Sequence, residues 1–423
     1  MKRPVPPLSQ DVVRNFEELM KEPAVQAALK QADDERDFAL AEQIALSEIP
    51  SPTFKERERA EEYARRMREY GLKDVHIDEI GNVVGRRPGK GDGPLVVMGA
   101  HMDTVFPEGT DVKVRREGNV LYGPGIGDNA SGLRAVLQTL RMFEKNKIET
   151  KGDIWFCGTV GEEGNGDIRG SKHLFKTHGD EIDGFLAVDN TDTGRILWGA
   201  IGAHRWRITI AGPGGHSYGS FGEIPSAIHA MCLAGTKVSR IKCVKEPKTT
   251  YNIGTIVGGT TVNTIASKCS VDVDIRSLDN DILLALEAEI KQCFVDAVDE
   301  TNAEFGVTPE NKGLRLEFEQ IGDRPAGFRP DDCPVILAAR GAQAAIGIEL
   351  NNYSISSTDA NAPVSMGIPA TCLSAGGCQM RTHTVDEYFE ITDIENGPKM
   401  IFLTALALAG TDKVAPMLPK RNK

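Results

Sequence analysis

The stretch VVMGAHMDTV at residues 96–105 constrains the fold of this chain more than any other. It begins as an apolar, uncharged run with β-branched residues, which predicts a buried strand. His101 and Asp103 follow two residues apart, so in a strand or its extension they point the same way. One imidazole and one carboxylate therefore leave the sheet edge together, as a metal ligand and the acid that orients it would. A packed strand-end histidine beside a loop aspartate would give the same pair, so this stretch alone decides nothing.

Further acidic side chains occur in similar positions downstream. Asp128 lies in the glycine-rich LYGPGIGDNASGL, directly before an apolar helical run. A carboxylate is favoured electrostatically at such a helix N-terminus, and helix capping is the role that competes with metal binding. Glu162 and Glu163 follow the predicted strand IWFCGTV, and Asp189 ends the apolar GFLAV. Two adjacent acids at the mouth of a buried strand are costly to desolvate unless a cation or a proton offsets them.

A second histidine completes the set far along the chain. His383 lies in RTHTVDEYF, after the apolar PATCLSAGG. Side chains at the carboxyl ends of strands gather at one edge of an open α/β sheet. Counting one acid of the adjacent pair Glu162 and Glu163, two histidines with three carboxylates suit zinc, cobalt or manganese, and they exceed what one tetrahedral zinc uses. The sequence therefore predicts a two-metal site with a bridging carboxylate.

Length and charge limit the remaining possibilities. The chain of 423 residues is long enough for two domains, and its net charge of -12 argues against nucleic acid and anionic membranes as partners. The N-terminus has no apolar signal core, and no stretch is long and apolar enough to span a bilayer, so a cytoplasmic location is expected. The eight cysteines are scattered without a CxxC pair, which predicts reduced thiols.

The order of predicted elements indicates an inserted domain. The first ninety or so residues read as helical cover, with Ser51-Pro52 as a helix start, followed by a hairpin in DVHIDEIGNVVGRRPG. From about Ala203 the pattern becomes strand, helix, two strands, helix, strand, which is the split β-α-β arrangement of a small α+β module. Because His383 lies beyond this module, we expect a discontinuous catalytic domain at residues 1–202 and 325–423 and an insertion at residues 203–324.

Eight strings occur in a shared order over most of the chain: GAHMDTV, GPGIGDNASG, GTVGEEG, AVDN, GPGGHSYG, GGTTVNTIA, DVDIRS and RTHTVDEY. In these the chain resembles the zinc metallopeptidase family (clan MH) of peptidase T, glutamate carboxypeptidase, acetylornithine deacetylase, succinyl-diaminopimelate desuccinylase and aminoacylase. The resemblance implies an α/β catalytic domain with a central mixed sheet flanked by helices. It also implies that the insertion is a ferredoxin-like α+β lid and dimerisation domain.

The resemblance also assigns roles to residues. His101 and Asp189 would hold one metal ion, Glu163 and His383 the other, and Asp128 would bridge both. Asp103 would orient His101, and Glu162 would be the general base. Because neighbouring residues of a strand face opposite ways, presenting both Glu162 and Glu163 to the metals requires an irregular backbone at residues 161–164.

Residues of the insertion would complete the site. His216 would stabilise the oxyanion in the partner subunit of a homodimer, and Asn263 would donate to the substrate carbonyl. Arg276 would pair with a substrate carboxylate, although a turn residue and a strand-edge salt bridge are the plain alternatives for His216 and Arg276. Asp359 lies in a polar loop that lines the substrate pocket in relatives.

We therefore expect a hydrolase with two divalent metal ions, zinc first and cobalt or manganese as alternatives, that cleaves an amide bond in a di- or tripeptide. One alternative is an N-acyl-amino-acid deacylase or carbamoylase, because both substrate classes need only an amide beside an anchored carboxylate. A catalytically silent metal-binding module is the more distant alternative. The intact set of ligands with Glu162 and His216 argues against it.

Overall fold

The computed structural model describes Val5 and residues 7–421, and the chain divides into two compact units. One unit comprises residues 201–327, and the other comprises the chain on both sides of it. The smaller unit is therefore an insertion in the sequence of the larger one.

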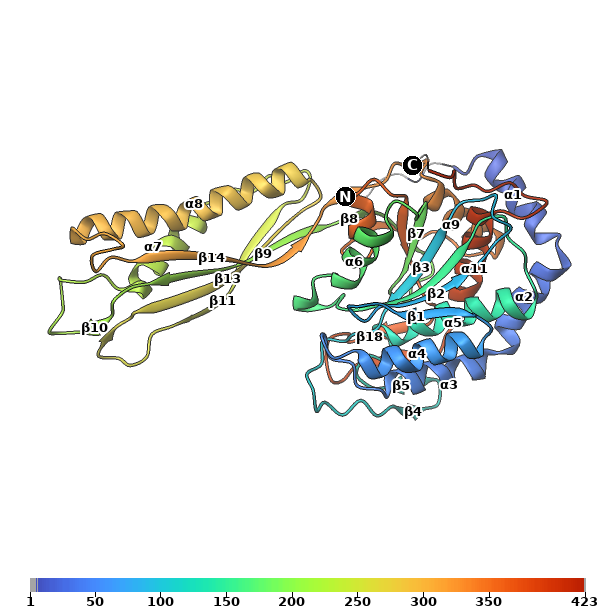
Figure 1. Cartoon of the computed structure of the whole chain (residues 1–423), viewed down its shortest axis with the longest axis horizontal. Helices are drawn as coiled ribbons and strands as arrows, with labels where there is room; N and C mark the ends of the chain where they lie inside the picture. Colours follow the sequence, from blue (N-terminus) through green and yellow to red (C-terminus); the bar gives the residue numbers. More distant parts are fainter. Residues whose placement is uncertain (1–4, 6, 422–423) are drawn as a thin grey trace. The chain divides into compact units, whose positions relative to one another are not determined.

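The larger unit contains a six-stranded mixed sheet in the order β1-β2-β6-β3-β7-β17 (Figure 1). The strands β6, β3, β7 and β17 run parallel, while β2 is antiparallel to both of its neighbours. This confirms the predicted α/β class and the predicted hairpin. The bounds are β1 (Asp74–Ile77), β2 (Val83–Arg87), β3 (Val96–His101), β6 (Ile154–Thr159), β7 (Gly184–Val188) and β17 (Ala370–Leu373).

Helices cover both faces of this sheet, as the apolar strands require. Val97 and Phe185 on one face belong to a buried cluster with Phe175 of α6. On the other face Phe156 contacts Phe143 of α5, which in turn packs on Phe402 of α11 at 4.7 Å between ring centroids. The helices of this unit are α1 (Gln10–Met20), α2 (Pro23–Asp34), α3 (Arg36–Ser47), α4 (Arg57–Glu69), α5 (Ala130–Lys145), α6 (Arg169–His178), α9 (Pro334–Ala345), α10 (Asn361–Ser365) and α11 (Asn396–Ala409).

One helix start differs from the prediction. The helix predicted from Ser51-Pro52 begins only at Arg57, because Pro52 instead forms a parallel bridge with Thr104. The segment before α4 is thereby held beside the end of β3 by a backbone hydrogen bond from Thr104 to Ser51.

Two small sheets of the larger unit were not predicted. One has the order β18-β19-β5-β4 and the other β15-β8-β16. Most of their strands are too short to show a periodic pattern. Their bounds are β4 (Arg115–Glu117), β5 (Val120–Tyr122), β18 (Cys378–Met380), β19 (Tyr388–Glu390), β8 (Arg195–Ala200), β15 (Gly327–Phe328) and β16 (Asn352–Ser356).

The smaller unit is an antiparallel four-stranded sheet in the order β11-β13-β9-β14. Two helices pack on the sheet and share an apolar core with it, in which Phe294 of α8 and Met231 of α7 are buried. The split β-α-β order of the prediction is confirmed. The bounds are β9 (Gly202–Ala211), β10 (Gly215–His216), α7 (Ala227–Val238), β11 (Thr250–Gly258), β12 (Thr264–Ile265), β13 (Lys268–Ser277), α8 (Asn280–Phe305) and β14 (Arg315–Arg324).

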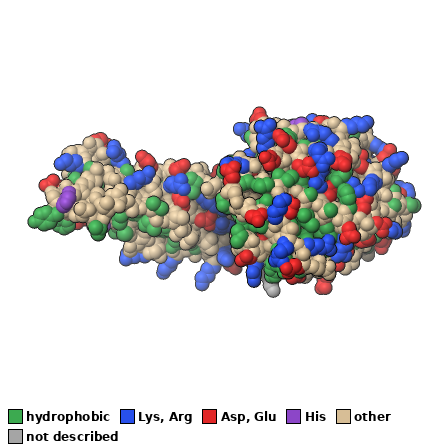
Figure 2. All heavy atoms as spheres, turned by 90° about the horizontal axis from the view of Figure 1, so that it is seen from below, with side chains coloured by type: hydrophobic (Ala, Val, Ile, Leu, Met, Phe, Trp, Pro, Cys, Tyr) green, Lys and Arg blue, Asp and Glu red, His purple; other side chains and the backbone are tan. Residues whose placement is uncertain are grey.

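Acidic and basic side chains are interspersed over the face shown in Figure 2, so no broad field of one sign covers it. Hydrophobic side chains gather at one end of the smaller unit in the same view. Among the described residues, no helix combines the length and apolarity that a bilayer crossing requires.

Candidate metal centre

Three parallel strands bring most of the predicted ligands to one sheet edge. His101 is the last residue of β3, Glu163 follows β6, and Asp189 follows β7. Because β6 and β7 both pair in parallel with β3, these strands end at the same edge. Asp128 reaches it from the loop before α5, where Asn129 is the N-cap residue and accepts a hydrogen bond from the Gly132 amide at 3.0 Å. Capping is therefore the role of Asn129, not of Asp128.

Four of the five predicted ligands are linked by contacts at hydrogen-bond distance. Asp128 is central, since its Oδ1 lies 3.1 Å from His101 Nε2 and its Oδ2 lies 3.2 Å from His383 Nε2. His383 Nε2 also lies 3.0 Å from Glu163 Oε1. Ligand atoms of His101, Asp128 and Glu163 all fall within 4.8 Å of one another, which meets the spacing of a metal site.

The electrostatics of this cluster favour a cation. Burial raises the pKa of Asp189 to about 6, and the negative charge of Asp128 acts in the same direction. Burial acts to raise the pKa of Asp128 as well, but hydrogen bonds with His101 and His383 outweigh it and the pKa is lowered. Hydrogen bonds with Asp128 and Glu163 raise the pKa of His383 to about 10. Burial acts to lower the pKa of His101, but hydrogen bonds with Asp103 and Asp128 outweigh it and the pKa is raised. Protons on the two imidazoles thus supply the positive charge that a divalent ion would bring to these acids.

The tautomer of His101 fits the same role. Its Nδ1 lies 3.0 Å from the main-chain oxygen of Asp103, an atom that can only accept. An Nδ1–H donated to this carbonyl leaves Nε2 facing Asp128, where it carries the second proton in the metal-free protein and would offer its lone pair to a metal ion once that proton is lost. The nearest carboxylate oxygen of Asp103 is farther away, at 3.6 Å. The main-chain oxygen and the carboxylate of Asp103 thus both lie beside His101 Nδ1, and the orienting role predicted for the carboxylate stays a prediction.

The Asp103 carboxylate instead holds the loop after β6. It is fully buried and accepts hydrogen bonds from the amides of Glu162 at 2.9 Å and Glu163 at 3.0 Å. Gly161 and Gly164 adopt positive φ angles of 65° and 50°, a conformation that favours glycine. The irregular backbone predicted at residues 161–164 is therefore present, and Glu162 and Glu163 are each only 6% exposed.

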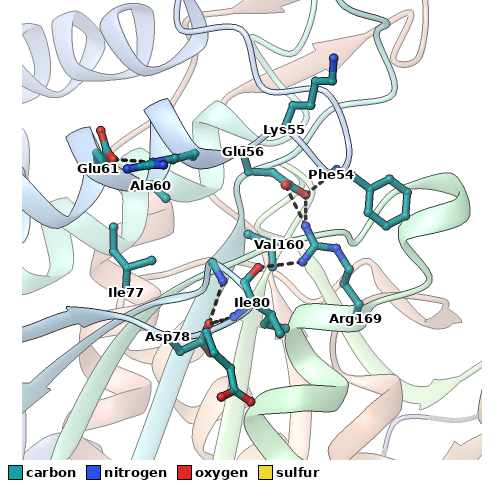
Figure 3. A pocket seen from close by; sticks show the side chains of 13 residues that line it. Phe54, Lys55, Glu56, Ala60, Glu61, Ile77, Asp78, Ile80, Val160 and Arg169 are labelled. Carbon is teal, nitrogen blue, oxygen red and sulfur yellow. Dashed lines mark hydrogen bonds and ion pairs between the residues drawn. The ribbon is translucent and has the colours of Figure 1, made fainter.

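Val160, which directly precedes this loop, lines a cavity of about 730 Å³, shown in Figure 3. Arg169 crosses it, donates to both carboxylate oxygens of Glu56 at 2.7 and 2.8 Å, and also donates to the Ile80 carbonyl. The Arg169 amide donates to the carbonyl of Gly161 at 3.3 Å. The wall of the cavity thus supports the backbone that carries Glu162.

In the smaller unit the structure brings two of the three predicted residues together. His216 lies on β10, which pairs with β12, and the Ser217 amide donates to the Asn263 carbonyl. His216 Nδ1 accepts from the amides of Tyr218 and Gly219, so in the neutral ring Nε2 carries the proton. Asn263 Oδ1 accepts from Thr261, which leaves its NH2 group as the donor. Both exposed side chains are therefore arranged as hydrogen-bond donors.

Arg276 and Asp359 have partners of their own. Arg276 lies on β13 and donates from Nε to Asp274 at 2.7 Å, with its side chain 40% exposed. Asp359 is 3% exposed and accepts a hydrogen bond from Thr159 at 2.5 Å. Their predicted contacts with substrate stay predictions.

Two supporting residues had no signal in the sequence. Thr53 donates to Asp103 Oδ2 at 2.9 Å, and the buried Arg59 donates to the Met102 carbonyl at 2.9 Å. Both hold the stretch that carries His101 and Asp103. Arg59 occurs in the charged run ERERAEEYARRMRE, where it cannot be distinguished from solvated neighbours by residue type.

Comparison with known proteins adds the family. Residues 97–407 match the sequence profile of Peptidase family M20/M25/M40. The chain is 27% identical over 381 residues to the uncharacterized protein YqjE of Bacillus subtilis, covering 86% of this chain and 96% of that protein. It is also 27% identical over 361 residues to succinyl-diaminopimelate desuccinylase of Corynebacterium glutamicum, covering 82% of this chain and 92% of that protein. A tripeptidase structure from Staphylococcus aureus superposes with a TM-score of 0.71 at 24% identity, covering 87% of this chain and 97% of that one.

Proposed function

The chain belongs to peptidase family M20/M25/M40, a family of metallohydrolases, and we propose that it cleaves an amide bond in a small peptide, with di- and tripeptides as the first candidates. One observation carries the proposal. His101, Asp128, Glu163 and His383 form a compact ligand cluster, and the acid next to Glu163 in the chain, Glu162, lies in the same buried loop.

The residues present fit two divalent ions, which we propose to be zinc. His101 and Asp189 would hold one ion, Glu163 and His383 the other, and the two oxygens of Asp128 would serve both. When bound, the ions supply Lewis-acid activation of a water molecule and of the scissile carbonyl.

Glu162 would move the proton in this reaction. Its carboxylate would accept a proton from the attacking water and return it to the amide nitrogen as the C–N bond breaks. The hydrogen bond from its own amide to Asp103 fixes the Glu162 backbone, and Arg169 supports the same loop at Gly161. Small movements of a catalytic group reduce the rate strongly, so this double support favours Glu162 as the base.

Charge stabilisation would come from the smaller unit. His216 Nε2–H and the Asn263 amide are both arranged to donate, which an oxyanion requires. We propose that the protein is a homodimer in which His216 serves the site of the partner subunit. Arg276 would bind the substrate carboxylate while sharing its guanidinium with Asp274.

The test is hydrolysis by the metal-stripped protein and by protein reconstituted with zinc or cobalt. Di- and tripeptides are compared with N-acetyl, N-succinyl and N-carbamoyl amino acids. Metal-dependent cleavage of peptides supports the proposal, and the products identify the terminus that is recognised. Bound metal without turnover of any of these amides would reject it.

The second candidate is an N-acyl-amino-acid deacylase, or a carbamoylase. The similarity to succinyl-diaminopimelate desuccinylase over 92% of its length favours a deacylase as strongly as the structural likeness favours a peptidase. The same metal-binding residues serve both reactions. A higher kcat/KM for acylated amino acids than for peptides would decide in favour of the second candidate.

A further inference from the structure

Glu387 is a buried acid that the proposed mechanism does not use. It follows His383 by four residues and is only 1% exposed. Its carboxylate lies against the glycine-rich loop before α5, which is more than 250 residues away in the chain. A buried carboxylate is costly unless hydrogen bonds compensate the loss of water, so its contacts with this loop must supply that compensation.

Among the described residues, the hydrogen bonds to this carboxylate come from the loop backbone. Glu387 Oε2 accepts from the Gly125 amide at 2.8 Å. Its Oε1 accepts from the amides of Gly127 at 2.8 Å and Asp128 at 3.0 Å. The main-chain oxygen of Glu387 also accepts from the Gly123 amide at 3.0 Å. One residue therefore fixes the loop from residue 123 to residue 128.

The loop conformation leaves little room for other arrangements. A Cβ atom at Gly127 would come within 2.6 Å of Gln379 Cβ and 3.1 Å of Glu387 Oε1. Gly125 has a φ of 78°, where other residues are strained. The glycines allow the backbone amides to converge on a single carboxylate, as they do in anion-binding loops.

We propose that Glu387 is a positioning residue for Asp128. The two oxygens of Asp128 face different histidines, so its direction must be fixed at the backbone. Glu387 provides this fixed point through the Asp128 amide. Because Glu387 and His383 belong to one short segment, that segment supplies one ligand and sets the position of another. The inference rests on the proposed function only in treating the cluster as a metal site.

Two variants separate positioning from loss of charge. Glu387→Ala leaves all three loop amides without their acceptor. Glu387→Gln keeps one oxygen for Gly127 and Asp128 but turns an NH2 group toward the Gly125 amide. Asp386→Asn is the matched control, because it removes an exposed acid at the neighbouring position.

The first measurement is metal binding, by competition with a chelator, together with the visible absorption of the cobalt-loaded protein. Loss of a residue that orients a metal ligand typically costs about 10- to 100-fold in metal affinity or activity. We expect a loss of this size and an altered cobalt spectrum for Glu387→Ala, a smaller effect for Glu387→Gln, and wild-type behaviour for Asp386→Asn. With the fold intact by circular dichroism, an unchanged affinity and spectrum in Glu387→Ala would overturn the proposal.

A second measurement needs no variant. In the metal-free wild-type protein, the amides of Gly125, Gly127 and Asp128 should exchange slowly with deuterium, because Glu387 holds them without metal. Rapid exchange at these amides would overturn the proposal even if Glu387→Ala failed to fold. Neither measurement depends on turnover, so a wild-type protein that binds metal but cleaves no amide would reject the proposed function alone.

Discussion

Glu162 and Glu163 are adjacent and equally buried, yet the proposed function gives them different tasks. Glu163 contacts His383 and would bind metal, whereas Glu162 would carry a proton. Both amides are held by Asp103, so the loop stays in place when either side chain is changed.

This difference predicts that two isosteric substitutions lower activity in different ways, one with metal retained and one with metal lost. Glu162→Gln should lower kcat by about 10²- to 10⁴-fold, because an amide cannot accept the proton, while two metal ions remain bound. Glu163→Gln should lose metal, and activity should fall as a consequence. Metal content by elemental analysis and kcat with a cleaved substrate test both variants. Glu162→Gln with near wild-type turnover would show that another group is the base.

At the residue scale, the sequence predicted positions that follow buried strands better than positions that support them. His101, Glu163 and Asp189 could be placed at one edge because parallel strands end together. Thr53 could not, since its bond to Asp103 depends on how a loop packs 50 residues away. The role of Glu387 in RTHTVDEYF could not be predicted, because nothing in the local sequence distinguishes a buried acid that binds amides from an exposed one.

At the scale of elements, long periodic segments were predictable and short ones were not. The six longer elements of the inserted unit, β9, α7, β11, β13, α8 and β14, follow the order that their alternating and helical patterns indicate. The strands β4, β5, β18 and β19 have three residues each, and their sheet depends on the long-range pairing of β19 with β5, as between Tyr388 and Tyr122. The predicted start of α4 at Ser51-Pro52 was wrong because a tertiary contact also decides the structure there: the bridge between Pro52 and Thr104 overrides the local helix signal.

His204 joins three elements of the inserted unit. It lies on β9, with Nδ1 2.5 Å from Glu287 of α8 and Nε2 3.2 Å from Asp323 of β14. The hydrogen bond with Asp323 raises the pKa of His204, burial acts against this, and the hydrogen bond with Glu287 adds to it. The charged imidazole therefore stabilises the folded unit.

The sign of this effect gives a pH-dependent prediction. Because the folded pKa lies above the unfolded value of about 6.5, the stabilisation is complete below about pH 6.5 and is lost as the pH rises through the folded pKa. His204→Gln should lower the free energy of unfolding by about 1.5 kcal/mol at the acidic end, and the difference should shrink toward alkaline pH. Urea unfolding of both proteins between about pH 5.5 and pH 9 tests this. A difference that stays constant over this range would contradict the prediction, and Asp323→Asn should weaken the pH dependence.

At the scale of the whole molecule, the proposed chemistry draws on both units. The proposed metal ligands belong to the larger unit, whereas His216 and Asn263 belong to residues 201–327. Two arrangements fit the chemistry of these side chains: His216 serves its own chain or, as we propose, the site of a second copy. Oligomers with closed symmetry allow the second arrangement, because each site then receives the same residue from its partner.

Complementation between two inactive variants distinguishes these arrangements. Glu162→Gln and His216→Ala chains are co-expressed with different affinity tags, and mixed dimers are isolated. The His216→Ala chain keeps Glu162 and would receive an intact His216 from its partner, so one of two sites should work and the dimer should reach about half of wild-type activity. Pairing His216→Ala with a chain that carries both substitutions is the control, and it should stay inactive. If His216 acts within its own chain, the first mixture will stay inactive as well, and if no mixed species can be isolated, the proposed homodimer is rejected.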